Sequence, residues 1–269
     1  MALAHLRWSS DLLRRKVETF VYLPENHRPP YPTLYLLHGL SDDASVWPRF
    51  TNLEKVAEQT GLAIVMPDGQ RSFYTDAEEG PAWGRFIAEE TIQRMESYFP
   101  LIPQGASRAI GGLSMGGYGA LRAALTYPDQ FASAHSHSGA LLRGSEPLPD
   151  PAEPDPDSPT AAYLISGDTR ELHRIFGANP AGKPHDLIFL VRQCHQKKQL
   201  PKIWIDCGRE DFLFQDNENF HRLLQKEEIP HHYATYPGEH DWAYWQERLP
   251  EVLRFHAAVL KGMDSSSLP

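Results

Sequence analysis

The chain is poor in cysteine and has no long apolar run. Two cysteines, Cys194 and Cys207, in 269 residues cannot build a disulfide framework, and we interpret both as reduced thiols. No apolar run approaches the roughly 18 residues that a membrane span requires, and residues 1–8 lack the uninterrupted apolar core of a signal peptide. With residue 1 taken as the natural start, these absences predict a cytoplasmic protein with no membrane partner.

Clustered positive charge is missing as well. The formal net charge is −9, and no basic run is longer than the three residues Arg14-Arg15-Lys16, with the pair Lys197-Lys198 elsewhere. Nucleic acids and anionic membrane surfaces are therefore not expected as partners. The sequence contains neither a calcium-binding loop nor a phosphate-cradling glycine loop, and no cofactor is expected.

Short apolar runs alternate with helical patterns along most of the chain, which is typical of an α/β protein. The runs predict a mainly parallel sheet of roughly eight strands with helices on both faces. Strands are predicted around residues 6–8 and over 17–23, 33–37, 62–66, 107–111, 131–137, 203–207 and 232–236. Helical spacing relates Ala88, Ile92, Met95 and Phe99, and likewise Trp245, Leu249, Val252 and Leu253.

One segment differs in composition from the rest. Residues 146–159 hold six prolines and five acidic residues, which predicts an exposed, mobile loop. From there to about Leu200 the helical pattern is broken. We interpret residues 143–200 as an insertion, either a cap or a loop, within a single domain that spans residues 1–269.

The stretch Gly112-Leu113-Ser114-Met115-Gly116 lies between a predicted strand and a segment rich in alanine and leucine. This is the context of a nucleophile elbow, in which a strand turns sharply into a helix with the serine at the apex. Glycine is needed on both sides because a side chain there would strike the neighbouring strand or helix. The helix N-terminus favours negative charge that develops beside it. We predict that Ser114 is a nucleophile; the alternative is an ordinary turn.

A serine nucleophile needs a base, and the base needs a carboxylate that orients it. In the order typical of α/β-hydrolases, the acid and then the histidine follow the serine along the chain. His240 is the predicted base, because it follows the last predicted strand, lies near Gly238 and precedes a helical pattern. The alternative is a histidine without a catalytic role.

Four carboxylates lie at or after the strand predicted over 203–207. We predict Asp211 as the acid and keep Glu210 as the alternative, because both lie in the turn that follows the strand. Asp206 lies inside the strand and is expected to pack or pair within the sheet. Asp216 is expected to cap a helix that begins near Asn217.

Ester hydrolysis also needs donors that bind the oxyanion. The backbone N–H of Met115, the residue after the nucleophile, is the first candidate. The second is the N–H of Leu40, in the loop after strand 33–37, where Gly39 lets the backbone approach a substrate. His38 is a conceivable second base, but its position at a strand end favours a role in holding this loop by hydrogen bonds.

Aromatic residues and histidine pairs near these loops admit two further hypotheses. The aromatic residues could wall an acyl or alcohol pocket, although such residues are as common in cores; they are Trp47, Tyr74, Trp83 and Trp242. Two histidine pairs, residues 135/137 and 231/232, allow a zinc site to be considered. No third ligand lies at a defined spacing from either pair, so no metal is expected.

Four blocks of the sequence resemble the putative-esterase branch of the α/β-hydrolases, which includes tributyrin esterases, S-formylglutathione hydrolases, feruloyl esterases and mycolyltransferases. The blocks are residues 36–39, 112–120, 207–211 and 238–242. The resemblance covers nearly the whole chain except about 143–200. It implies an α/β-hydrolase fold, a triad of Ser114, Asp211 and His240, and oxyanion amides at Leu40 and Met115. The tributyrin-esterase type, cytosolic enzymes that cleave short-chain acyl esters, is the most similar.

The histidine block departs from the S-formylglutathione hydrolases. Those enzymes carry a Gly-x-Asp-His-Ser type of block, whereas this chain has Gly238-Glu239-His240-Asp241-Trp242. A glutathione thioester is therefore less expected as a substrate than an oxygen ester.

These features together predict a serine carboxylesterase that hydrolyses short-chain acyl esters through an acyl-enzyme. The alternatives are a carbohydrate esterase that removes acetyl or feruloyl groups and an S-formylglutathione-type thioesterase. Acyl transfer to an alcohol is less expected, and so is a non-catalytic binding protein, because no triad member is missing. The expected partner is a small-molecule ester, and the sequence leaves open whether the chain forms a homo-oligomer.

Overall fold

The computed structural model describes residues 2–148 and 169–262. Most of the proline-rich stretch lies outside these residues. The strands are β1 (Ala2–Ser10), β2 (Arg15–Leu23), β3 (Thr33–Leu37), β4 (Ala63–Pro67), β5 (Arg108–Leu113), β6 (Ser133–His137), β7 (Lys202–Gly208) and β8 (His232–Tyr236). The longer helices are α2 (Leu53–Thr60), α4 (Ile92–Tyr98), α5 (Met115–Thr126), α7 (Thr169–Phe176), α8 (Leu187–Gln196), α9 (Phe214–Lys226) and α10 (Trp242–Leu260). Short helical segments are α1 (Val46–Phe50), α3 (Trp83–Arg85), the π-helical η1 (Phe86–Thr91) and the 3₁₀ turn η2 (Gly105–Ser107).

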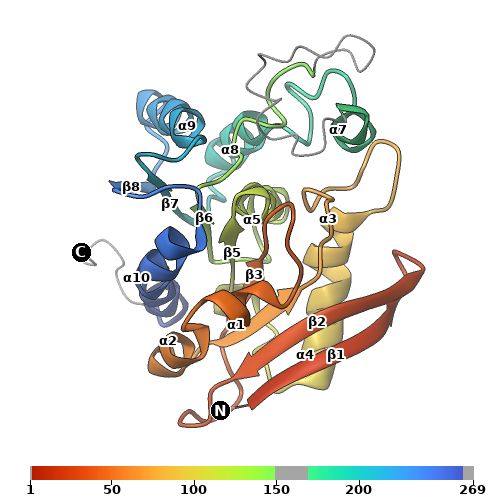
Figure 1. The fold of residues 1–269 in the computed structure, drawn as a ribbon, viewed down its shortest axis with the longest axis vertical. Coiled ribbons are helices and arrows are strands. Elements are labelled where there is room, and N and C mark those ends of the chain that lie inside the picture. The colour runs from red at the N-terminus through yellow and green to blue at the C-terminus, as the bar shows by residue number, and fades with distance from the viewer. Residues whose placement is uncertain (1, 149–168, 263–269) are drawn as a thin grey trace.

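The eight strands form one sheet in the order β1-β2-β4-β3-β5-β6-β7-β8 (Figure 1). The six strands from β3 to β8 run parallel to one another, and β1 and β2 form an antiparallel hairpin at one edge, where β2 pairs antiparallel with β4. The prediction of a mainly parallel sheet of about eight strands is confirmed. Each predicted strand is present, with ends that differ from the expected ones by a few residues.

Two apolar layers cover the two faces of the sheet. Helices α1, α2 and α10 supply one layer, in which Trp47, Leu53 and Val252 belong to the same apolar cluster as buried residues of β3 and β4. The other layer contains η1, α4, α5, α8 and α9 (Figure 1). Alternate residues of β3 divide between the layers: Leu34 enters the first and Tyr35 the second. This burial on both faces explains why the central strands read as continuous apolar runs.

Residues 143–200, the predicted insertion, contribute α7 and α8 to the described structure. Helix α8 packs against α5, and Glu171 of α7 accepts hydrogen bonds from Arg71 at 2.7 and 3.0 Å. In the described parts of the chain no helix is long and apolar enough to cross a membrane.

Parallel strands place their carboxyl ends at one edge of the sheet, where ligands bind in open α/β sheets. His38 follows β3, Ser114 follows β5, Asp211 follows β7 and His240 follows β8. The topology therefore gathers residues from four distant parts of the sequence at this edge.

Beneath this edge the core contains a chain of buried histidines. His135 Nδ1 lies 2.7 Å from His256 Nε2, and His256 Nδ1 lies 2.8 Å from Ser133 Oγ, so that hydrogen bonds join β6 to α10. Burial lowers the pKa of His256 to about 3 and that of His135 well below its ordinary value. Both imidazoles are therefore neutral at neutral pH.

This burial predicts that acid destabilises the fold. Between about pH 6.5 and pH 5 a histidine takes up a proton in the unfolded chain, whereas His256 stays neutral in the folded protein. The free energy of unfolding therefore decreases as the pH is lowered. The loss amounts to about 2 kcal/mol for one such histidine at about pH 5, and it vanishes above about pH 7. His256→Gln should remove this contribution, which urea unfolding at about pH 7.5 and pH 5 would measure. The exposed His27→Gln is the control. An unchanged pH dependence in His256→Gln would contradict the prediction.

Candidate active site

Ser114 occupies a sharp turn between β5 and α5. Its backbone has a φ of 53° and a ψ of −117°, a conformation that L residues rarely adopt. The turn is held because Ser114 N–H donates to His137 O at 2.9 Å and Ser114 O accepts from Tyr118 N–H at 3.1 Å. The predicted strand–serine–helix turn is thus confirmed as a backbone geometry.

The glycines on either side of Ser114 are required by close backbone contacts. A Cβ atom on Gly112 would lie 2.6 Å from Leu37 O, and one on Gly116 would lie 2.6 Å from Leu37 O and 2.7 Å from His38 O. Carbon cannot approach backbone oxygen this closely, so any side chain would push α5 away from β3. The glycines of the motif are therefore needed for the steric reason expected from the sequence, namely to avoid clashes with the neighbouring backbone.

His240 and Asp211 form a hydrogen-bonded pair across the loops after β7 and β8. His240 Nδ1 lies 2.8 and 3.0 Å from the two carboxylate oxygens of Asp211. The Asp211 side chain is fully buried and also accepts from Leu213 N–H at 2.7 Å, whereas His240 is 15% exposed. Because a carboxylate only accepts hydrogen bonds, Nδ1 carries the proton and Nε2 is left free to accept one.

The other carboxylates near β7 have different partners. Glu210 accepts from Gly238 N–H at 2.6 Å and so joins the loop after β7 to the loop that carries His240. Asp206 is buried within β7 and, as expected, is paired there: it lies 2.8 Å from His137 Nδ1 and accepts from Trp204 and Tyr244. Asp211, not Glu210, is the carboxylate that contacts His240.

The expectation for Asp216 is wrong. Helix α9 begins at Phe214, three residues earlier than predicted, and Asp216 lies inside its first turn without capping it. Leu213 N–H donates to Asp211 Oδ1 and Phe214 N–H donates to Asp211 O at 2.9 Å, so the helix begins directly after the turn at Asp211.

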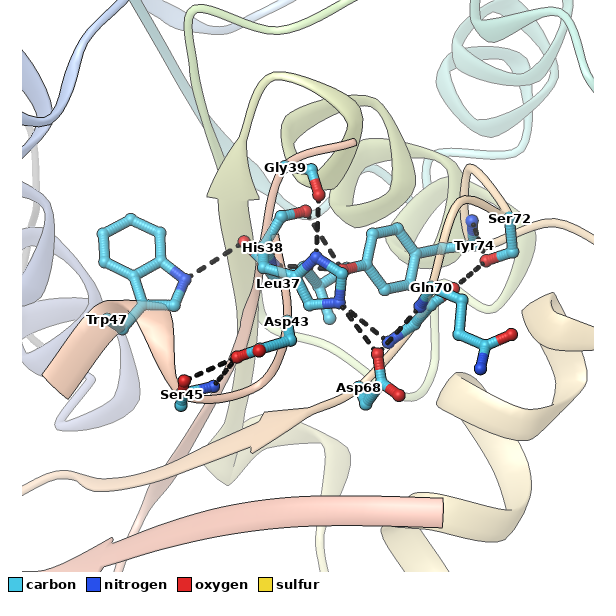
Figure 2. A network of polar contacts seen from close by, with 11 residues as sticks. Leu37, His38, Gly39, Asp43, Ser45, Trp47, Asp68, Gln70, Ser72 and Tyr74 are labelled. Carbon is cyan, nitrogen blue, oxygen red and sulfur yellow. Dashed lines mark hydrogen bonds and ion pairs between the residues drawn. The ribbon is translucent and has the colours of Figure 1, made fainter. Parts of the chain in front are cut away.

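The loop after β3 is held by His38 and Tyr74 (Figure 2). Gly69 N–H lies 2.9 Å from His38 Nε2, which makes Nε2 an acceptor, so the proton is on Nδ1 and donates to Gly39 O at 2.8 Å. The Tyr74 hydroxyl accepts from His38 N–H and donates to His38 O, both at 3.0 Å. The prediction that His38 holds the loop by hydrogen bonds is confirmed.

This loop and the start of α5 border one cavity of about 410 Å³. The cavity is lined by Gly39, Leu40, Ser41, Asp42, Leu113, Ser114, Phe212, His240, Asp241, Trp242 and Trp245. Ser114 and His240 thus open onto the same space. Met115 is the first residue of α5, so its amide has no acceptor within the helix, and Leu40 lies in the cavity wall.

The four aromatic residues predicted for the pocket wall are not all found there. Trp242 lines the cavity, whereas Trp47 is fully buried behind it and packs edge-on against Trp242 at 5.3 Å between ring centroids. Tyr74 is fully buried beneath the loop, and Trp83 borders a different cavity near Arg71. Trp47, Tyr74 and Trp83 thus follow the alternative that the sequence left open, because all three belong to the apolar core clusters.

The structure adds residues to the cavity that the sequence did not single out. Phe212, 55% exposed, follows Asp211 directly and lies 4.4 Å from the His240 ring. Trp245 was predicted only as part of a helical apolar stripe, yet it lies edge-on to His240 at 5.0 Å. The third added cavity residue is Asp42, two residues beyond Leu40. Proximity in sequence to a predicted site residue was the only signal for Phe212 and Asp42.

The two histidine pairs considered for zinc bind other partners. His135 is joined to His256 and His137 to Asp206, and His231 Nε2 lies 2.7 Å from His221 Nδ1. Among residues 2–148 and 169–262, no three His, Cys, Asp or Glu side chains form a group that could hold a metal ion.

A serine on a strand-to-helix turn, facing a histidine–carboxylate pair at the carboxyl edge of a mainly parallel sheet, defines a serine hydrolase of the α/β-hydrolase fold. The sequence matches the Putative esterase family over residues 10–256, and the chain belongs to this family. The predicted family and fold are confirmed, and the chain is a carboxylic ester hydrolase.

Individual relatives agree with this assignment. The chain is 30% identical to an acetyl esterase of Caldicellulosiruptor saccharolyticus over 96% of its own length and 99% of that protein. It is similar to the structure of a fluorophosphonate-binding serine hydrolase of Staphylococcus aureus, with a TM-score of 0.82 and 28% identity over 95% and 98% of the two chains. An S-formylglutathione hydrolase of Staphylococcus aureus gives a TM-score of 0.80 and 28% identity over 96% and 100% of the two chains.

The position of the loop after β3 is expected to depend on the Tyr74 hydroxyl. Tyr74→Phe leaves the buried N–H and C=O of His38 without partners, which should cost about 1–3 kcal/mol of unfolding free energy. Movement of the loop should also lower kcat/KM for a simple ester by about 10-fold to 100-fold. Urea unfolding and ester hydrolysis on the same preparation would measure both effects.

The matched control is Tyr22→Phe, which removes a tyrosine hydroxyl that donates to Glu58 at 2.6 Å on the other face of the sheet. It should lower stability without lowering kcat/KM. Equal kinetic effects of the two substitutions would show that the loss in Tyr74→Phe is not specific to the loop.

Proposed function

We propose that the protein is a carboxylesterase that hydrolyses short-chain acyl esters, with Ser114, His240 and Asp211 as its catalytic triad. The observation that carries the proposal is the Asp211–His240 hydrogen bond beside a cavity onto which Ser114 also opens. The pairing leaves His240 Nε2 as the only basic nitrogen of that ring, and a serine hydroxyl needs such a base in order to attack a carbonyl.

In the proposed reaction Ser114 Oγ attacks the ester carbonyl while His240 Nε2 takes its proton. The buried carboxylate of Asp211 stabilises the imidazolium that forms. The amides of Leu40 and Met115 donate to the oxyanion, and His240 then protonates the departing alcohol oxygen as the carbon–oxygen bond breaks. Water repeats the sequence on the acyl-enzyme: its oxygen adds to the acyl carbon while His240 takes its proton, and His240 then returns that proton to Ser114 Oγ as the bond between Oγ and the acyl carbon breaks and the acid leaves.

The site supports a small acyl group. The cavity of about 410 Å³ is bounded by the bulky side chains of Phe212, Trp242 and Trp245 close to the serine, and the relative that is 30% identical over nearly its full length is an acetyl esterase. A thioester of glutathione and an acetylated or feruloylated carbohydrate remain the alternative substrates of the same triad. The glutathione thioester is supported by the S-formylglutathione hydrolase among the structural relatives.

The acyl preference is tested with p-nitrophenyl acetate, butyrate, octanoate and palmitate. We expect the highest kcat/KM at acetate or butyrate and a steep loss by octanoate, because the aromatic wall limits the length of the acyl chain. Ser114→Ala should lower kcat by about 10⁶. Retention of most of the activity in Ser114→Ala would refute the mechanism, and rates that persist to palmitate would refute the small pocket.

The identity of the acid is tested by a matched pair of substitutions in adjacent residues. Asp211→Asn should lower kcat by about 10⁴, because the amide favours the wrong tautomer of His240. Glu210→Gln should lower it by less than about tenfold, because the glutamine oxygen can still accept from Gly238 N–H. Steady-state kinetics with p-nitrophenyl acetate would distinguish them. A larger loss in Glu210→Gln would transfer the role of the acid to Glu210.

A further inference from the structure

The wall of the Ser114 cavity is acidic as well as aromatic. Two of its eleven lining residues, Asp42 and Asp241, carry carboxylates, and none is a lysine or an arginine. Asp241 is engaged as the N-cap of α10, where it accepts from Tyr244 N–H at 2.9 Å. Asp42 caps no helix, and its carboxylate lies beside Gly39 at the edge of the cavity.

Asp42 lies next to the nucleophile. A Cβ atom on Gly39 would lie 3.1 Å from Asp42 Oδ2 and 3.8 Å from Ser114 Cβ, so the carboxylate and the serine flank the same glycine. A turn brings the side chain there, because Asp42 N–H donates to Gly39 O at 3.3 Å. In the described part of the chain, no lysine or arginine forms an ion pair with Asp42. Its charge therefore acts directly on whatever occupies the space beside Ser114.

The surroundings of Asp42 strengthen its electrostatic effect. Burial raises the pKa of Asp42, while His38, the Gly39 amide and His240 act in the opposite direction. A partly buried charge is screened less by water and salt than an exposed one. The guanidinium of Arg49 lies over the ring of Phe50 and does not line the cavity.

We infer that Asp42 is a specificity-determining residue, which makes the esterase select against substrates that carry a negative charge beside the scissile ester bond and favours neutral or cationic ones. The inference rests on the proposed function. It assigns no step of the reaction to Asp42: the carboxylate acts on the group of the substrate that occupies the cavity, through repulsion of anions and attraction of cations.

Three butyrate esters that differ only in the charge of a tetrahedral head group provide the test. They are the esters of choline, 3,3-dimethylbutanol and 2-hydroxyethanesulfonate, whose head groups are cationic, neutral and anionic and similar in size. The ratio of kcat/KM for the anionic ester to that for the neutral one is measured at about pH 8, where the carboxylate is ionised. Differences in intrinsic reactivity cancel when this ratio is compared between the wild-type protein and its variants.

Asp42→Asn, nearly identical in shape, should raise the ratio of the anionic to the neutral ester by about tenfold and lower the ratio of the cationic to the neutral ester. Any effect of Asp42 on the charge of the tetrahedral intermediate is common to the three esters and cancels from both ratios. Asp42→Ser also removes the charge and serves if Asp42→Asn does not fold. In the wild-type protein the discrimination should weaken between about 0.05 and 1 M NaCl.

Asp43→Asn is the matched control. Asp43 is the next residue, is exposed, accepts from Ser45 and does not line the cavity, so its substitution should leave both ratios within about twofold. Unchanged ratios in both Asp42 variants would overturn the inference while leaving the esterase activity intact. Absence of Ser114-dependent hydrolysis of all three esters would instead refute the proposed function, and the inference with it.

Discussion

The site depends on the close approach of the first turn of α5 to the end of β3. Gly116 lies so near the carbonyls of Leu37 and His38 that a single methyl group would not fit between them. This contact fixes Ser114, which begins the turn, relative to Gly39 and Leu40, which follow β3. The nucleophile and the loop proposed to bind the oxyanion are therefore brought together by a contact of backbone with backbone, and the side chains of His38 and Tyr74 hold the loop in place. A preorganised site of this kind needs little reorganisation during the reaction.

The histidine side of the site is built by different means. The loops after β7 and β8 are joined by side-chain hydrogen bonds: Glu210 to the Gly238 amide, and Asp211 to His240. Asp211 also holds Leu213 N–H at the start of α9. The buried carboxylate of Asp211 thus orients the imidazole of His240 and also lies at the end of its own loop, the one after β7. The two neighbouring acids thus have different partners: Glu210 holds the loop after β8, and Asp211 holds the ring of His240.

The sequence was sufficient for those features that depend on local rules. The strands could be predicted from apolar runs. The turn at Ser114 could be predicted from its flanking glycines, because steric requirements act over a few residues. Asp42 and Phe212 could not be predicted, because their place in the cavity depends on how loops after different strands meet. The error at Asp216 has the same origin: α9 begins directly after the turn at Asp211, and the Asp211 side chain contacts a histidine 29 residues away. The choice between Glu210 and Asp211 also needed this long-range geometry.

The aromatic wall links the chemistry of the histidine to the shape of the cavity. Phe212 lies 4.4 Å from the His240 ring, Trp245 lies 5.0 Å from it, and Trp245 in turn contacts Trp242 at 5.2 Å. Aromatic faces attract cations, so the rings that bound the substrate also lie where an imidazolium would form in the proposed mechanism. Removal of one ring would therefore alter both the fit of the substrate and the packing around the His240 ring. Because a substitution at this wall changes both, the proposed selectivity for charge is better tested at Asp42, which lies on the loop after β3 rather than on the loops that carry Asp211 and His240.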